Sequence, residues 1–182
     1  MMKRSIKLNI ALVIALSILT LLTSQWPWVF AQSQEINLID NKHNWKPFRD
    51  TIISQNESGL EILVVTNHTG KIYSRAFLPT QINSAMNKSL ILTLDYASQS
   101  NKGNATFLAE IRANTSKVTD NSSSKVLWNS ALNNTNGQLS NETFTIPSKI
   151  TNRPVEIRLN VITEGKGEHT LTIKKANIVH SS

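Results

Sequence analysis

Apolar and polar residues alternate with a period of two over much of the chain. In residues 90–97 the even positions are Leu, Leu, Leu and Tyr, and in residues 155–161 the odd positions are Val, Ile, Leu and Val. This alternation is typical of β-strands with one buried face. Residues 107–112 repeat it, and the polar turn formers of residues 98–104 lie between two such runs. We therefore expect 90–97 and 107–112 to form an antiparallel hairpin with a long loop.

Shorter runs of the same kind predict strands at 51–54, 60–66, 71–78, 125–128, 142–146 and 170–178. Beyond the N-terminal segment, no window of 12 or more residues has the i, i+3, i+4 apolar spacing of an amphipathic helix. Residues 113–124 have low complexity and are expected to form a surface loop. Eight or nine short strands separated by Asn, Ser and Gly turns predict an all-β fold, an antiparallel sandwich or barrel.

The first 31 residues follow a different pattern. An apolar run of 15 residues, 8–22, comes after three basic positions, Lys3, Arg4 and Lys7. The run is shorter than the about 20 residues that span a bilayer as a helix, and small residues ending at Ala31 follow it, as in a secretory signal peptide. We expect cleavage after Ala31 and a single domain of residues 32–182, secreted or displayed on the extracellular surface. An uncleaved N-terminal anchor, the only membrane contact we would then expect, is the alternative.

Composition limits the choice of partners. The segment after residue 31 has 19 − 3 = 16 Lys and Arg against 12 Asp and Glu, a net charge of +4, and the chain has no cysteine. The fold therefore holds together without disulfides. The positive charge is scattered and is not interleaved with aromatic residues, which argues against nucleic-acid binding. Weak attraction to an anionic envelope or glycan is compatible with it.

Eight Asn-x-Ser/Thr sequons follow the leader, about twice the number expected by chance. Most fall in predicted loops, so they are candidate N-glycosylation sites of an exported glycoprotein. An Asn-rich surface made of turns is the alternative. The sequons are at Asn56, Asn67, Asn87, Asn104, Asn114, Asn121, Asn133 and Asn141.

Four segments resemble the strands of galactose-binding-like jelly-roll β-sandwiches, a superfamily that includes many carbohydrate-binding modules. NKHNW at 41–45 with GLEI at 59–62 is similar to their first strands, and LILTLDYAS at 90–98 to a central strand. GEHTLTIKKANI at 167–178 is similar to their last strand. The resemblance covers residues 35–180. It implies an antiparallel jelly-roll-type sandwich that is non-catalytic and binds glycans through loops or one sheet face.

The resemblance also implies a structural calcium ion, which such sandwiches often contain. Calcium is bound by carboxylates and backbone carbonyls. Glu35 and Asp40 near one end of the domain, with Glu168 near the other, are the candidate ligands. No other cofactor is expected.

Sugar recognition uses aromatic rings that stack on apolar sugar faces, so the Trp and Tyr residues are candidates. Trp45 stands among polar neighbours and is the aromatic that we expect to be exposed, although a Trp here can also plug the core. Tyr73 and Trp128 are further candidates, and Trp128, like Tyr96, lies in an apolar run that favours the core or its rim.

Polar residues on alternate strand positions form a second candidate site, because they could hydrogen-bond sugar hydroxyls from one sheet face. The alternative is a solvated sheet face stabilised by cross-strand charge pairs. The residues are Thr93, Asp95, Glu110, Arg112, Glu156, Arg158 and Asn160.

Catalysis has weak support. A glycosidase needs two carboxylates, and Asp95 with Glu110 is the available pair, but the predicted hairpin separates them by several residues. No Gly-x-Ser-x-Gly motif occurs, and the four histidines lack metal-ligand spacing. We therefore predict a secreted or surface-displayed, non-catalytic binding module for a glycan or cell-envelope polymer. A structural or adhesive envelope protein that contacts other proteins is the alternative, and an enzyme with unrecognised residues is a third reading.

Overall fold

The computed structural model describes residues 35–40, 43–57, 59–82, 89–113, 125–150 and 153–181. The predicted leader and its cleavage position lie outside these ranges, and so does most of the predicted loop at 113–124. Residues 35–182 form one compact unit. Within the described ranges, no helix has the length and apolar character needed to cross a membrane.

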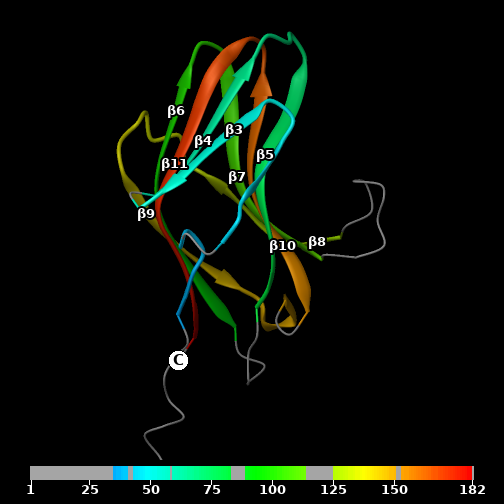
Figure 1. Cartoon of the computed structure of the whole chain (residues 1–182), viewed down its shortest axis with the longest axis vertical. Helices are drawn as coiled ribbons and strands as arrows, with labels where there is room; N and C mark the ends of the chain where they lie inside the picture. Colours follow the sequence, from blue (N-terminus) through cyan, green and yellow to red (C-terminus); the bar gives the residue numbers. More distant parts are fainter. Residues whose placement is uncertain are drawn as a thin grey trace, which may run out of the picture. The chain divides into compact units, whose positions relative to one another are not determined.

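The described residues form eleven strands and one short 3₁₀ helix. Sheet A has the order β3-β4-β11-β6-β9, with β1 also paired to β11, and sheet B has the order β2-β5-β10-β7-β8. All pairs are antiparallel (Figure 1). The elements are β1 (Ile36–Asn37), β2 (Lys46–Phe48), β3 (Thr51–Asn56), β4 (Gly59–Thr66), β5 (Lys71–Gln81), β6 (Leu90–Asn101), β7 (Asn104–Ala113), β8 (Val126–Leu132), β9 (Ser140–Ile146), η1 (Ser148–Ile150), β10 (Pro154–Glu164) and β11 (Gly167–His180).

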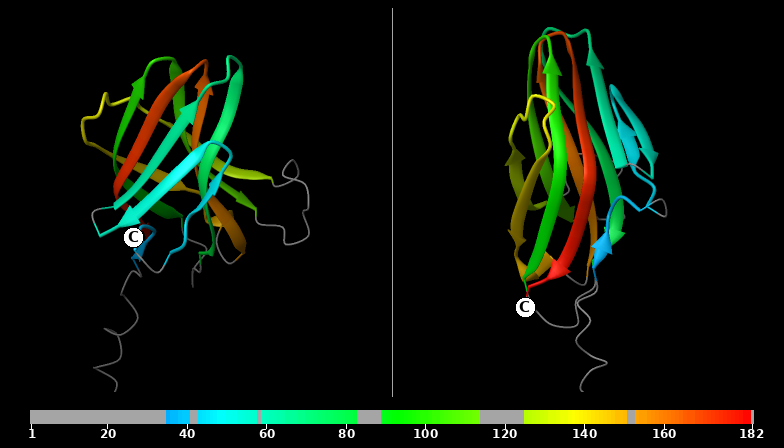
Figure 2. Two further views of the ribbon diagram at one scale, coloured as in Figure 1. Left: turned by 45° about the horizontal axis from the view of Figure 1, so that its top comes forward. Right: turned by 90° about the vertical axis from the view of Figure 1, so that its left-hand side faces the viewer.

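The chain passes between the sheets at nearly every turn. From β4 to β11 successive strands change sheet, except at the β7–β8 connection. This wrapping of two face-to-face sheets is that of a jelly roll (Figure 2). The predicted fold class is confirmed. The nine longer strands, β3 to β11, agree with the predicted eight or nine, and the two- and three-residue strands β1 and β2 are additional.

The predicted hairpin between 90–97 and 107–112 is wrong. β6 pairs with β11 and β9, whereas β7 pairs with β10 and β8. The expected long loop is mostly strand, because β6 extends to Asn101 and β7 begins at Asn104. Lys102 and Gly103 make the turn with φ of 62° and 72°. Each strand buries its apolar face against the opposite sheet, and the alternation alone does not say which strand is its neighbour.

The core between the sheets differs at its two ends. One end is apolar and contains Leu38, Trp45 and Ile150. The other end lies under the β4–β5, β6–β7 and β10–β11 turns, which the pairing register brings together. Buried polar side chains collect there, namely Thr66, Ser74, Ser98, Thr163 and His169.

The β8–β9 loop is attached to β6 by side-chain hydrogen bonds. The Tyr96 hydroxyl donates to Glu142 Oε1 and accepts from the backbone N–H of Asn133 at 2.9 Å. Burial first and the Glu142 bond second raise the pKa of Tyr96 to about 12. Ser98 N donates to Thr135 Oγ1 at 2.8 Å, and Thr135 N donates to Ser98 Oγ at 3.0 Å. These bonds hold the loop over the polar end of the core.

Candidate ligand-binding face

Charged side chains gather on the outer face of sheet B, on its three central strands. In β10 the odd positions from 155 to 163 are buried between the sheets, so the even positions point outward. Directly paired residues of neighbouring antiparallel strands share a face. We call the resulting group the charged face; its members are Arg75 on β5, Glu110 and Arg112 on β7, and Glu156, Arg158 and Asn160 on β10.

The centre of the charged face is built from one tripeptide used twice. Glu-Ile-Arg occurs at 110–112 in β7 and at 156–158 in β10. The strands are antiparallel, so Glu156 lies opposite Arg112 and Arg158 lies opposite Glu110. Within each strand the arginine Nε donates to Oε1 of the glutamate two residues earlier, at 2.9 Å for Arg112. The four charges therefore form a neutral quartet, with an ion pair along each strand and opposite charges at directly paired positions of the two strands.

This part of the face is buried. Arg158 is 4% exposed, Glu110 is 6% exposed and Asn160 is 7% exposed. Asn160 Nδ2 donates to Glu110 Oε2 at 3.2 Å, so both oxygens of that carboxylate accept hydrogen bonds. Buried charges are stable only when they are paired and hydrogen-bonded, as these are. The alternative of an open, solvated sheet face does not describe these three residues.

Arg75 adds a third guanidinium beside the quartet. It lies on β5 opposite Asn160, and its Cζ is 4.0 Å from the centroid of the Phe48 ring, within the range of a cation–π contact. Burial first and the nearby Arg158 second lower the pKa of Arg75 to about 10, against the opposing effect of Glu156. The group therefore remains charged at neutral pH.

Tyr73 provides an accessible aromatic ring next to these charges. It precedes Arg75 by two residues on the same face of β5, and it lies opposite Ile162 of β10. Its exposed fraction is 49%, and Lys71 Nζ lies 5.8 Å from its ring centroid. An aromatic ring with one apolar surface in water and polar groups nearby is the arrangement that sugar binding uses.

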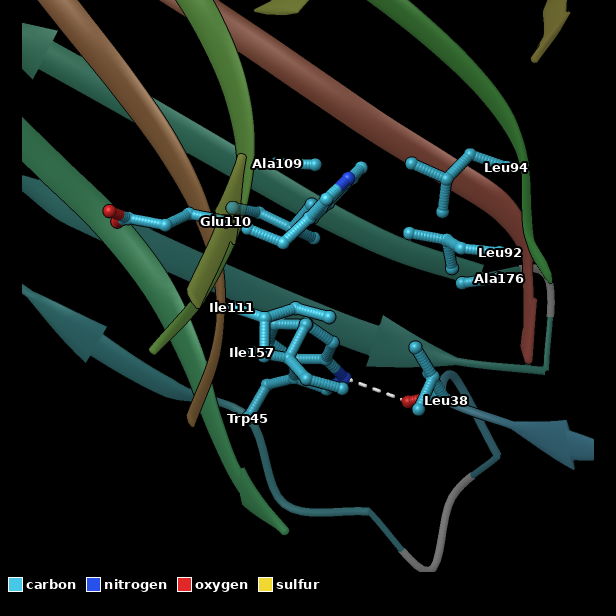
Figure 3. Close-up of a pocket in the computed structure, with 11 residues that line it drawn as sticks. Leu38, Trp45, Leu92, Leu94, Ala109, Glu110, Ile111, Ile157 and Ala176 are labelled. Carbon is cyan, nitrogen blue, oxygen red and sulfur yellow. Dashed lines mark hydrogen bonds between the residues drawn. The ribbon is translucent and has the colours of Figure 1, made fainter. Parts of the chain in front are cut away.

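Trp45 is not exposed, so that prediction is wrong. It is 5% exposed, and its Nε1 donates to the backbone oxygen of Leu38 at 2.9 Å (Figure 3). The indole plugs the apolar end of the core, which is the alternative weighed from the sequence. It offers no ring face to a ligand.

Trp128 also packs on the core. It is opposite Ile111, on the inward phase of β8, and its ring meets that of Phe144 edge-on, with centroids 5.7 Å apart at 67°. Both tryptophans line a small apolar cavity of about 10 Å³, room for about one water molecule. The Glu110 side chain points away from this cavity, toward the charged face (Figure 3). The cavity is a packing gap and not a glycan site.

The predicted polar field is divided between the two sheets. Glu110, Arg112, Glu156, Arg158 and Asn160 lie together on sheet B. Thr93 and Asp95 lie on β6 in sheet A, and Asp95 accepts a hydrogen bond from Asn141 Nδ2. Packed sheets are about 10 Å apart, and Asp95 and Glu110 point outward on opposite sides. They cannot act as an acid/base pair.

The three candidate calcium ligands do not come together. Glu35 precedes β1 and accepts from Asn177 Nδ2 near the end of β11, whereas Glu168 is near the start of that strand. Ten residues separate Glu168 from Ile178, the partner of Ile36, which corresponds to about 33 Å along a strand. Glu35 and Glu168 therefore cannot bind one ion. The described side chains also contain no cluster of three or more His, Asp or Glu able to hold a metal, and Asp40 joins none.

The sequons inside the described ranges are all exposed: Asn56, Asn67, Asn104, Asn133 and Asn141. Three of them are in strands, at the end of β3, the start of β7 and within β9. Asn133 Nδ2 donates to Glu142 Oε1 at 2.8 Å, and Asn141 Nδ2 donates to Asp95. Glycosylation would use these two nitrogens. Asn87, Asn114 and Asn121 lie outside the described residues, and use of any sequon stays a prediction.

Sequence reasoning missed Arg75 and the neighbouring aromatic Phe48. A signal for Arg75 was present, since the predicted strand 71–78 places Tyr73, Arg75 and Phe77 on one phase. No comparable signal marked Phe48, because the three-residue strand β2 is too short to show a period.

No protein-family model matches the chain, and no curated protein matches it in sequence. Solved structures do match. A "xylan-binding module CBM15" aligns over 82% of this chain and 98% of its own length, with a TM-score of 0.52 and 15% identity. A CBM61 module in complex with β-1,4-galactotriose aligns over 78% of this chain and 90% of its own length, with a TM-score of 0.47 and 5% identity.

A carbohydrate-binding module described as belonging to the β-sandwich superfamily aligns over 84% of this chain and 59% of its own length. Its TM-score is 0.49, at 15% identity. The likeness to the xylan-binding module is one of fold. The chain thus shares a β-sandwich fold with this module, in agreement with the sandwich that the resemblance of its strands implied.

Proposed function

We propose that this protein is a secreted or surface-displayed, non-catalytic module that binds a glycan or cell-envelope polymer on the outer face of sheet B. The observation that carries the proposal is the charged face itself. Its central side chains are buried and hydrogen-bonded before any ligand arrives, and the half-exposed Tyr73 stands beside them. The fold shared with a xylan-binding module supports the same function.

The arrangement suits sugar recognition for two reasons. The Tyr73 ring can pack on an apolar sugar face, while the half-buried Arg75 guanidinium next to it can hydrogen-bond hydroxyls. Arg75 is half-buried and packed on Phe48, so binding removes little of its side-chain freedom. Avoiding that entropy loss, about 0.5–1.5 kcal/mol for each immobilised side chain, favours affinity.

The same arrangement does not suit hydrolysis. A glycosidase needs one carboxyl group that gives a proton and a second carboxylate that acts as base or nucleophile. Glu110 accepts hydrogen bonds from Arg112 and Asn160, and Glu156 accepts one from Arg158. Neither carboxylate is placed to deliver a proton to a glycosidic oxygen, so the face binds without chemistry.

A glycan array followed by calorimetry on the purified chain tests the proposal. Tyr73→Ala should weaken binding about tenfold or more, because loss of a central aromatic contact costs more than about 1.4 kcal/mol. Ile52→Ala is the matched control, since Ile52 is 61% exposed on β3 of sheet A. It should leave the affinity within twofold. Both variants should unfold at the wild-type urea midpoint.

Equal affinities of Tyr73→Ala and the wild-type protein would contradict the proposal, as would an array on which no glycan binds. Co-purification with an envelope protein in the absence of glycan binding would instead favour the structural or adhesive alternative.

A further inference from the structure

Resting on the function proposed above, we infer that the ligand is an acidic glycan, and that a uronate carboxylate binds at Arg75 while the sugar ring contacts Tyr73. The inference comes from the charge balance of the face, from the spacing of these two residues and from the way Arg75 is held.

The charge balance is positive. The charged face contains three guanidiniums, from Arg75, Arg112 and Arg158, against the two carboxylates of Glu110 and Glu156, a net charge of 3 − 2 = +1. Each Glu-Ile-Arg tripeptide is neutral by itself, so the excess positive charge is that of Arg75. The largest charge effect on Arg75 is repulsion from Arg158, which lowers its pKa. A ligand carboxylate would relieve that repulsion.

The surroundings of the face add to the excess. Lys46 of β2 lies opposite Phe77 on the same face and is exposed. Where β5 begins and β10 ends, Lys71 Nζ is 3.5 Å from Glu164 Oε1, so the charges of these two residues cancel. With Lys46 included, the face has a net charge of +2, which favours an anionic ligand over a neutral one and accelerates its approach.

The spacing fits a single sugar unit. Tyr73 and Arg75 are alternate residues of one strand, so their Cα atoms are about 6.6 Å apart on the same face. A pyranose ring packed on Tyr73 would hold a substituent on its rim near the Arg75 guanidinium. That planar group presents two parallel N–H donors, which match the two oxygens of a carboxylate.

Phe48 keeps the guanidinium in place. Its ring lies 4.0 Å from Arg75 Cζ and belongs to β2, the neighbouring strand in sheet B. Arg75 is half-buried, and its position is therefore set by packing before a ligand binds. A carboxylate bound there would gain more than at a mobile surface lysine, because less side-chain freedom is lost.

The test compares charged and uncharged forms of the same sugars. Oligomers of galacturonate, glucuronate and mannuronate, and their methyl esters, are titrated into the wild-type chain, Arg75→Gln, Arg75→Lys and Lys175→Gln. Lys175 is exposed on β11 in sheet A, so its variant removes the same charge from the opposite face. Thermal unfolding confirms that each variant folds.

We expect at least one uronate oligomer to bind the wild-type chain about tenfold tighter than its methyl ester, a preference that weakens with added salt. Arg75→Gln should abolish this preference, so that the uronate binds no tighter than its methyl ester. Arg75→Lys should keep part of the preference for the uronate. In Lys175→Gln the ratio of uronate to ester affinity should stay within twofold of the wild-type ratio.

Three results would overturn the inference and leave the proposed function standing. Two of them are esters that bind as tightly as uronates, and uronate binding unchanged in Arg75→Gln. Polyglutamate bound as tightly as the uronate would also overturn it, because charge would then suffice without the sugar. If no uronate, ester or neutral glycan binds the folded wild-type chain, the proposed function fails with it.

Discussion

His169 should make the protein less stable in mild acid. The residue lies on the inward phase of β11, between Val64 of β4 and Ser100 of β6, and is 0% exposed. Neither of its ring nitrogens has a hydrogen-bond partner among the described residues. Burial lowers the pKa of His169, against a smaller opposing effect from Glu168. The folded protein therefore holds this imidazole in its neutral form.

Proton linkage gives the direction and the size of this pH effect on stability. Above the ordinary histidine pKa of 6.5, the residue is neutral in both the folded and unfolded states and stability is unaffected. Below pH 6.5 the unfolded chain takes up a proton that the folded chain does not. The free energy of unfolding then falls by up to about 1.4 kcal/mol for each pH unit, until the lowered pKa of the folded state is reached.

Urea unfolding of the wild-type chain, His169→Gln and His68→Gln at pH 8.0, 7.0, 6.0 and 5.5 measures this effect. His68 is exposed and serves as the matched control. The wild-type chain and His68→Gln should lose stability below pH 6.5. The free energy of unfolding of His169→Gln should fall less steeply, by up to about 1.4 kcal/mol less for each pH unit. An identical pH dependence in His169→Gln and the wild-type chain would refute the reasoning, whatever the absolute stability of the variant.

Two further predictions concern the framework around the site. Tyr96→Phe removes the hydroxyl that joins Glu142 to the backbone of Asn133, and should lower the free energy of unfolding by about 1–3 kcal/mol; a urea midpoint equal to that of the wild-type chain would contradict this. Gly59 has φ of 134°, and a Cβ there would lie 2.3 Å from a β11 carbonyl oxygen. Gly59→Ala should therefore cost about 2 kcal/mol or more in urea unfolding, whereas Gly70→Ala, with open space around it, should stay within about 0.5 kcal/mol. Equal costs for the two glycines would show that steric crowding is not the cause.

Period-two alternation was enough to predict an all-β fold of antiparallel strands and part of the candidate site, and the resemblance of four segments to jelly-roll sandwiches then favoured a sandwich over a barrel. In β7 and β10 it separated the buried positions from the outward Glu and Arg correctly, because each strand has one face against the opposite sheet. It could not assign strands to sheets. The neighbours of a strand depend on contacts far along the sequence, so 90–97 and 107–112 look like a hairpin although they belong to different sheets.

Local sequence also misjudged Trp45 and Asp95. Polar neighbours suggested that Trp45 is exposed. His43 and Asn44 lie on the coil before β2 and Lys46 begins that strand, while the indole turns inward to the Leu38 carbonyl. Asp95 is on the outward phase of its strand, as the alternation predicted. Its strand is in sheet A, so it faces away from Glu110. In both cases the side chain's environment is set by tertiary packing, which no short window of sequence contains.

The jelly-roll crossings explain why the site can exist at all. β10 is inserted between β5 and β7, although these strands precede it by dozens of residues. Asn160 donates to Glu110 across 50 positions of sequence, and Arg158 lies opposite Glu110 only when β10 has paired with β7. Before that pairing the same charges are solvated, and they gain little from one another. Burial of the quartet thus depends on the pairing of β10 within sheet B, so any variant that loosens β10 should weaken the proposed ligand binding together with the fold of this sheet.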